Sequence, residues 1–155
     1  MNVYVPYRIG QVIPPEIAAG DRESEICRVP VMNHIPGCGR LNKWVNWQLI
    51  FSLSVRDRVV VVADSDQILK KDDLVAMLEK LHAGADIVIL TEIGHPVWCV
   101  RRDFWGAHVM TYAGPDNCSF CAWFRELEKN GFKIERVGRK LDTIPRDRDL
   151  RPPRH

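Results

Sequence analysis

Two carboxylates stand one residue apart directly after a run of apolar residues. Asp64 and Asp66 flank Ser65, and residues 59–63 before them are four valines and an alanine. Such a β-branched run is typical of a strand buried in a parallel sheet, and ligands bind beyond the carboxyl ends of these strands. Two like charges at that edge are costly unless a cation compensates them. We therefore predict that Asp64 and Asp66 bind Mn²⁺ or Mg²⁺ with phosphate oxygens of a substrate. The alternative is a turn with two solvated acids.

The chain has five cysteines, an odd number that argues against a disulfide framework. Cys118 and Cys121 form a single CxxC, which is the pattern of a redox pair or of half a zinc site. No second pair follows at a similar spacing, so we interpret these residues as two ordinary thiols at the start of a helix. His95 follows an expected strand end, where it could touch a metal or an acceptor. We interpret it as a surface histidine.

The rest of the chain alternates between strand-like and helix-like segments. Strands are expected at residues 3–7, with Pro6 ending the first, and at 26–32, 58–63, 85–91, 97–101 and 132–137. Helices are expected at residues 42–54, 72–82 and 120–130, with a short one opening at 14–16 and a loop at 34–40. This alternation predicts an α/β fold with a mainly parallel sheet flanked by helices.

The composition is typical of one folded domain. The 155 residues are 46% hydrophobic and 27% charged, which excludes a disordered chain, a collagen and a coiled coil. We expect a single domain over residues 1–145 and an extended Arg- and Pro-rich tail over residues 146–155. A net charge of +2 gives no global attraction to nucleic acid or membranes. No apolar run could span a bilayer and no signal-peptide pattern opens the sequence, so we expect a cytoplasmic protein.

The order of these features resembles the GT-A fold glycosyltransferases, nucleotide-sugar enzymes of the family 2 type. The buried strand that ends in Asp64-Ser65-Asp66 looks like the metal-binding centre of that family. The other similar segments are Val5-Pro6-Tyr7-Arg8, the basic and Asn-containing residues 39–46, the turn Gly114-Pro115-Asp116-Asn117, and the helix that leads from it to the Gly-aromatic-x-Ile of residues 131–134. No segment is specific alone, and the resemblance rests on their succession over roughly residues 1–138.

The resemblance implies a short, metal-dependent hexosyltransferase with a single-domain, Rossmann-like GT-A fold. It would move a sugar from a nucleotide-diphosphate donor, with a UDP-sugar as the first expectation, to an unknown hydroxyl acceptor. Asp66 would hold the metal, Asp64 would contribute directly or through the ribose or a water, and Asp116 would be the catalytic base. The residues expected at the substrate are Pro6, Tyr7 and Arg8 at the nucleotide, Arg40 and Lys43 near the diphosphate, Asp64, and Trp105 as an aromatic on the acceptor side.

Two departures from the family pattern keep other functions open. Asn117 follows Asp116 where the family often has a second acid, and the chain is short, so the acceptor side is minimal or comes from another subunit. One alternative is therefore a nucleotide-binding module of this fold that has lost catalysis. Another is a phosphohydrolase with Asp64 as nucleophile, although such enzymes usually have Thr or Val where this chain has Ile68. An exposed sheet edge in so short a fold would also allow a homodimer.

Overall fold

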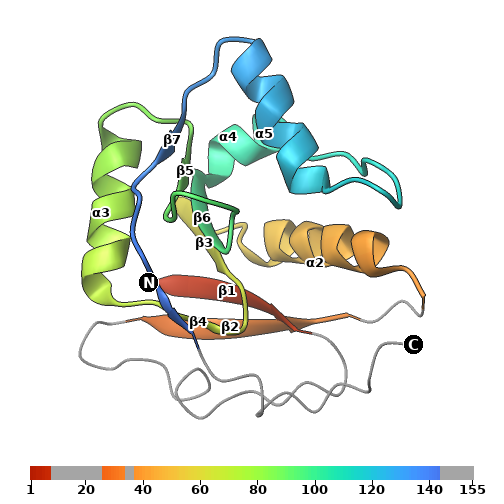
Figure 1. Ribbon diagram of the computed structural model, residues 1–155, viewed down its shortest axis with the longest axis horizontal. Coiled ribbons are helices and arrows are strands. Elements are labelled where there is room, and N and C mark those ends of the chain that lie inside the picture. Colours follow the sequence, from red (N-terminus) through yellow and green to blue (C-terminus); the bar gives the residue numbers. More distant parts are fainter. Residues whose placement is uncertain (8–25, 34–36, 144–155) are drawn as a thin grey trace.

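A six-stranded sheet with the order β2-β1-β3-β6-β5-β7 forms the middle of the molecule (Figure 1). The computed structural model describes residues 1–7, 26–33 and 37–143. Three of the five neighbouring strand pairs are parallel, which confirms an α/β fold with a mainly parallel sheet. The strands are β1 (Asn2–Tyr7), β2 (Cys27–Met32), β3 (Val59–Ala63), β5 (Ile87–Ile89), β6 (Val97–Arg101) and β7 (Ile134–Arg136).

β6 runs antiparallel to both of its neighbours, β3 and β5. The connection from β5 to β6 spans only residues 90–96, whereas a parallel crossover needs about a dozen residues or more. The short connection therefore explains the reversed direction of β6. The register pairs Ala63 with Val97, so this connection lies beside the residues that follow β3.

Helices cover both faces of the sheet (Figure 1). α3 (Lys71–His82) lies on one face, and α2 (Gly39–Leu53), α4 (Arg102–Ala107) and α5 (Ser119–Lys129) lie on the other. Along β3 the side chains alternate between the two cores: Val61 packs toward α3, and Val60 packs toward α2 and α5. The result is a three-layer α/β/α arrangement.

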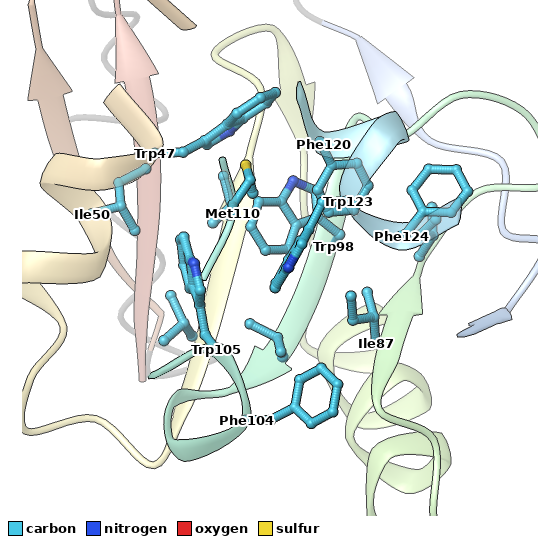
Figure 2. Close-up of a cluster of buried hydrophobic side chains, with 14 of the residues drawn as sticks. Trp47, Ile50, Ile87, Trp98, Phe104, Trp105, Met110, Phe120, Trp123 and Phe124 are labelled. Atoms are coloured by element: carbon cyan, nitrogen blue, oxygen red, sulfur yellow. The ribbon is translucent and has the colours of Figure 1, made fainter. Parts of the chain in front are cut away.

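The core under α2, α4 and α5 is rich in aromatic rings (Figure 2). Trp98 of β6 stacks on Phe120 of α5, with ring centroids 4.4 Å apart, and lies 5.5 Å from Trp105 of α4. Trp47 of α2 and Trp123 of α5 pack edge-on against Trp98. We call these five residues the aromatic cluster. Because they come from four elements, the aromatic cluster positions α2 and α5 relative to β6.

Most bounds differ from the prediction by one or two residues, and two differences are larger or have a structural reason. α2 begins at Gly39 rather than at residue 42. Pro6 stays inside β1 instead of ending it, in register with Val31 of β2. The proline is tolerated because β1 pairs with β3 only at Val3 and Tyr4, so the missing N–H falls where β1 has a single strand partner in the described structure.

Two further features were missed by the sequence analysis. α4 follows β6 without a break, so no turn signal marks its start. A two-stranded ribbon joins β4 (Gln67–Ile68) to β8 (Asp142–Thr143), and two-residue strands are too short to show a period. The helix expected at residues 14–16, the first part of the 34–40 loop (residues 34–36) and the tail at 146–155 lie outside the described residues. Among the helices that are described, none has the length and apolar character needed to cross a membrane.

The hydroxyl of Tyr4 on β1 donates a hydrogen bond to the Asp57 carboxylate. Burial, followed by this hydrogen bond and the charge of Asp57, raises the pKa of Tyr4 from 10.0 to about 12. A raised pKa stabilises the folded state below the unfolded value, and the contribution is lost as pH rises through the folded value. We therefore expect the free energy of unfolding to fall between pH 10.0 and about 12, and to fall less steeply in Tyr4→Phe. Urea unfolding across this range checks the expectation, with Tyr112→Phe as the control. Equal slopes for all three proteins would contradict it.

Candidate functional site at the carboxyl end of β3

Asp64 and Asp66 lie in a turn that directly follows β3. The Asp64 amide donates to the Pro96 carbonyl at 2.7 Å, and the Gln67 amide donates to the Asp64 carbonyl at 3.2 Å. The side-chain nitrogen Nε2 of Gln67 donates to Oδ1 of Asp66 at 3.1 Å. The turn is therefore held between the β5–β6 connection on one side and the β4–β8 ribbon on the other. We call residues 64–66 the acidic turn.

The acidic turn has charged neighbours of both signs. Burial raises the pKa of Asp64, the positive charges of Lys43 and His95 oppose that shift, and the charge of Asp66 adds to it. Lys43 belongs to α2, and its ammonium lies 5.9 Å from the centre of the Trp47 ring. The structure thus brings together Asp64, Asp66 and Lys43, three of the residues singled out in the sequence, and adds His95 to them.

His95, Cys118 and Cys121 form a second group of chemically active side chains. One ligand atom from each of the three lies within 4.8 Å of the others. His95 Nε2 is 3.3 Å from Cys118 Sγ, and the Cys121 amide donates to the same sulfur at 3.5 Å. We call these three residues the His-Cys cluster. The expected position of the CxxC at a helix start is confirmed, because Cys118 is the N-cap of α5.

The two thiols of the His-Cys cluster have very different acidities. Burial acts to raise the pKa of Cys118, but the His95 hydrogen bond, the Cys121 amide and the His95 charge outweigh it and lower the pKa to about 6. Burial, followed by the hydrogen bond and charge of Cys118, raises the pKa of Cys121 to about 11, while Arg125 and Arg40 oppose this shift. Cys118 is therefore the thiolate of the pair at neutral pH. Arg40, predicted near a diphosphate, lies close enough to act on Cys121.

The His95 ring is held by aromatic neighbours. Its centroid lies 4.9 Å from that of Phe120 and 6.3 Å from that of Trp47, both members of the aromatic cluster. The sequence analysis missed the link between His95 and the CxxC because 22 residues separate His95 from Cys118. A usable signal was present: His95 lies just past one strand end, and the CxxC opens a helix whose apolar face must pack on the same sheet.

Two of the three predicted nucleotide-binding residues near the N-terminus, Pro6 and Tyr7, lie in β1. Tyr7 is 1% exposed and belongs to the core on the α3 side, where burial raises its pKa to about 12. Its hydroxyl has no hydrogen-bond partner among the described residues. Pro6 is half-buried in the pairing with β2. Arg8 lies outside the described residues.

Trp105 does not occupy an acceptor side. Its side chain is 1% exposed and packs against Phe51, Trp98 and Trp123 inside the aromatic cluster. An aromatic ring that stacks on a sugar needs a free face, and both faces of the Trp105 ring are covered by the core. The prediction that Trp105 contacts the acceptor is therefore wrong. The interpretation of Trp44 and Trp47 as residues that pack toward the sheet is confirmed.

Asp116 lies in an exposed turn two residues before the helix cap Cys118. Gly114 in this turn has a φ of +96°, a conformation that favours glycine. The side-chain nitrogen of Asn117 donates to the Ala113 carbonyl at 3.3 Å and so helps to close the turn. Asp116 thus stands on the segment that leads into the His-Cys cluster, and its role as a base remains a prediction.

These observations define an α/β protein whose acidic turn and His-Cys cluster meet at the carboxyl end of β3. No protein-family model and no curated protein matches the sequence significantly. A solved structure described as CMP:2-keto-3-deoxy-manno-octonic acid synthetase complexed with CTP is similar over 86% of this chain and 87% of that chain, with a TM-score of 0.46 and 12% sequence identity. A likeness at this level carries no information on activity, so the function proposed below rests on the residues of this chain.

Proposed function

We propose that this chain is a metal-dependent glycosyltransferase of the GT-A type that binds a nucleotide-diphosphate sugar, with a UDP-sugar as the first candidate. The observation that carries the proposal is the acidic turn at the carboxyl end of β3, together with Lys43, whose positive charge acts on Asp64. Ligands of α/β sheets bind at this edge. A positive charge that acts on one carboxylate of the acidic turn supports a site where a metal and a diphosphate are bound together.

The donor atoms of the acidic turn suit a hard divalent cation. Asp64 and Asp66 offer carboxylate oxygens, and only one oxygen of Asp66 is engaged by Gln67 in the described hydrogen bonds. Oxygen-only ligand sets favour Mg²⁺ and Mn²⁺, which keep open positions for water and phosphate oxygens. When bound, the metal would neutralise charge that develops on the leaving diphosphate.

The other residues would act through charge and proton transfer. Lys43 would attract the diphosphate, and Arg40, at the exposed start of α2, would add a second positive charge. Asp116 would accept the proton of the acceptor hydroxyl, which requires the turn at residues 114–117 to bring its carboxylate within hydrogen-bond reach of that hydroxyl.

Thermal unfolding with candidate donors tests this proposal. UDP, UDP-sugars and other nucleoside diphosphates are each added with and without Mn²⁺ to the wild type, Asp66→Asn and Asp72→Asn, the last being an exposed acid outside the acidic turn. A ligand at 100 times its Kd stabilises by about 2.7 kcal/mol, which at roughly 2–4 °C per kcal/mol raises Tm by about 5–10 °C. We expect this shift only with Mn²⁺ present, lost in Asp66→Asn and kept in Asp72→Asn. A flat panel, or an equal shift without metal, would refute the proposal.

The second candidate is a nucleotide-binding module of the same fold without catalysis. It is favoured by Asn117, which replaces a second acid in the turn and whose side chain is engaged by Ala113. Both candidates predict the metal-dependent shift, and only the transferase predicts slow release of sugar from the donor. A phosphohydrolase would instead release phosphate from a generic phosphate ester and require Asp64 as nucleophile.

A further inference from the structure

We propose that His95, Cys118 and Cys121 bind one zinc ion as the three protein ligands of a tetrahedral site whose fourth position is open. This goes beyond the function proposed above, which uses only the oxygen ligands of the acidic turn. Zinc prefers nitrogen and sulfur ligands, and sites with three protein ligands leave one position for water or a substrate. The two sites would therefore select different metals.

The distances within the His-Cys cluster are close to those of a zinc site. With Zn–S near 2.3 Å and Zn–N near 2.0–2.1 Å, the ligand atoms of a tetrahedral site lie roughly 3.5–3.8 Å apart. His95 Nε2 and Cys118 Sγ are already 3.3 Å apart, and all three ligand atoms fall within 4.8 Å. Small side-chain adjustments would therefore complete the geometry. Among the described residues this is the sole group of three or more His, Cys, Asp or Glu side chains that converges in this way.

The ligands come from two separate parts of the fold, and each is held in place. His95 belongs to the β5–β6 connection, and its ring packs on Phe120 and Trp47. Cys118 and Cys121 open the eleven-residue helix α5. Phe120 lies between them in the sequence and is fully buried in the aromatic cluster, so it anchors that first turn.

The charges of the cluster also suit a dication. Two thiolates and one neutral imidazole together carry two negative charges, which balance the two positive charges of zinc. The positive charges of Arg40 and Arg125 act to lower the pKa of Cys121, although burial and Cys118 outweigh them in the metal-free protein. The positive end of the α5 dipole also favours negative charge at the first turn, where both sulfurs lie. The three side chains are half-buried, which leaves room for an exchangeable fourth ligand. The charge of His95 acts on Asp64, so the His-Cys cluster lies near the acidic turn.

Cobalt substitution tests the proposal directly on the full chain. The protein, kept reduced and stripped of metal by a chelator, is titrated with Co²⁺ and then with Zn²⁺. We expect one Co²⁺ per chain, a thiolate-to-cobalt charge-transfer band in the near ultraviolet, strong visible bands of tetrahedral cobalt, and loss of all of them when Zn²⁺ is added. Co²⁺ binding without the thiolate band, or no binding at all, would overturn the proposal without any variant.

Matched variants then assign the ligands. Cys118→Ser, Cys121→Ser and His95→Gln are each expected to weaken Zn²⁺ binding by at least tenfold, because even a residue that only orients a ligand typically contributes roughly 10–100-fold. Cys38→Ser, at an exposed cysteine outside the cluster, is expected to bind like the wild type. Unchanged Zn²⁺ affinity in the three cluster variants, or an equal loss in Cys38→Ser, would refute the assignment.

The acidic turn gives an independent control. Asp66→Asn is expected to keep the cobalt–thiolate spectrum, and excess Mn²⁺ is expected not to displace it, because Mn²⁺ prefers oxygen ligands. The two proposals can therefore be refuted separately. If no candidate donor changes Tm but the cobalt spectrum is intact, only the glycosyltransferase proposal is refuted. Loss of the cobalt spectrum in Asp66→Asn would overturn the zinc site as placed here.

Discussion

Alkylation of Cys118 in the metal-free protein is expected to rise with pH around a midpoint near its pKa of about 6, while Cys121 follows a midpoint near about 11. The reacting species is the thiolate, so the pH profile of the rate reports the pKa of each thiol. The measurement uses iodoacetamide at a series of pH values in the presence of a chelator, with mass spectrometry of the two cysteines. The pH midpoint is preferred to the rate at one pH, because a thiolate of low pKa is also a weaker nucleophile.

His95→Gln is expected to move the Cys118 midpoint upward from about 6 toward the ordinary thiol value of 9.0. The substitution removes both the imidazole hydrogen bond and its positive charge, which together offset the effect of burial. His82→Gln, an exposed histidine on α3, is the control and should leave both midpoints unchanged. A Cys118 midpoint near 9.0 in the wild type, or no change in His95→Gln, would show that the contact between His95 and Cys118 is not formed in solution.

Trp98→Ala is expected to be the most destabilising single substitution in the aromatic cluster. Trp98 is 1% exposed and contacts rings from α2, α4 and α5. Truncation of a buried tryptophan typically costs about 3–5 kcal/mol, since the cavity cannot fully collapse. At roughly 2–4 °C per kcal/mol, Tm should fall by about 6–20 °C.

Leu53→Ala at the end of α2 is the matched control, because that leucine is 58% exposed. Surface substitutions of this kind usually change stability by about 0.5 kcal/mol or less. Differential scanning calorimetry of both variants checks the prediction, and near-ultraviolet circular dichroism should show a loss of aromatic signal only in Trp98→Ala. A fall in Tm no larger than that of the control would mean that the cluster repacks around the missing ring.

The sequence predicted the strands and helices whose signals are local. The valine run became β3, and the helices expected at residues 42–54, 72–82 and 120–130 became α2, α3 and α5, with bounds that differ by three residues or fewer. The direction of β6 could not be predicted from its own residues, because it follows from the length of the connection before it. The β4–β8 ribbon depends on two short segments that meet only in the folded chain.

Only those parts of the candidate site that form a local sequence pattern could be predicted. Only Ser65 separates Asp64 from Asp66, so the two acids at a strand end form a local sequence pattern. The contact between His95 and Cys118 is a tertiary contact, and a lone histidine and a single CxxC are each ambiguous in isolation. Trp105 shows the opposite error: a tryptophan near a strand end could contact a sugar or fill the core, and only packing decides between them.

The placement of β6 between β3 and β5 bears on how fast the chain folds. In the sequence, α3 and β5 lie between β3 and its neighbour β6, and β4 pairs with β8 near the end of the described residues. Closing such long loops costs entropy before the contacts repay it, and high contact order slows folding. We expect slow folding for a chain of this length, with the acidic turn among the last parts to become ordered, because both of its supports depend on contacts between distant parts of the sequence.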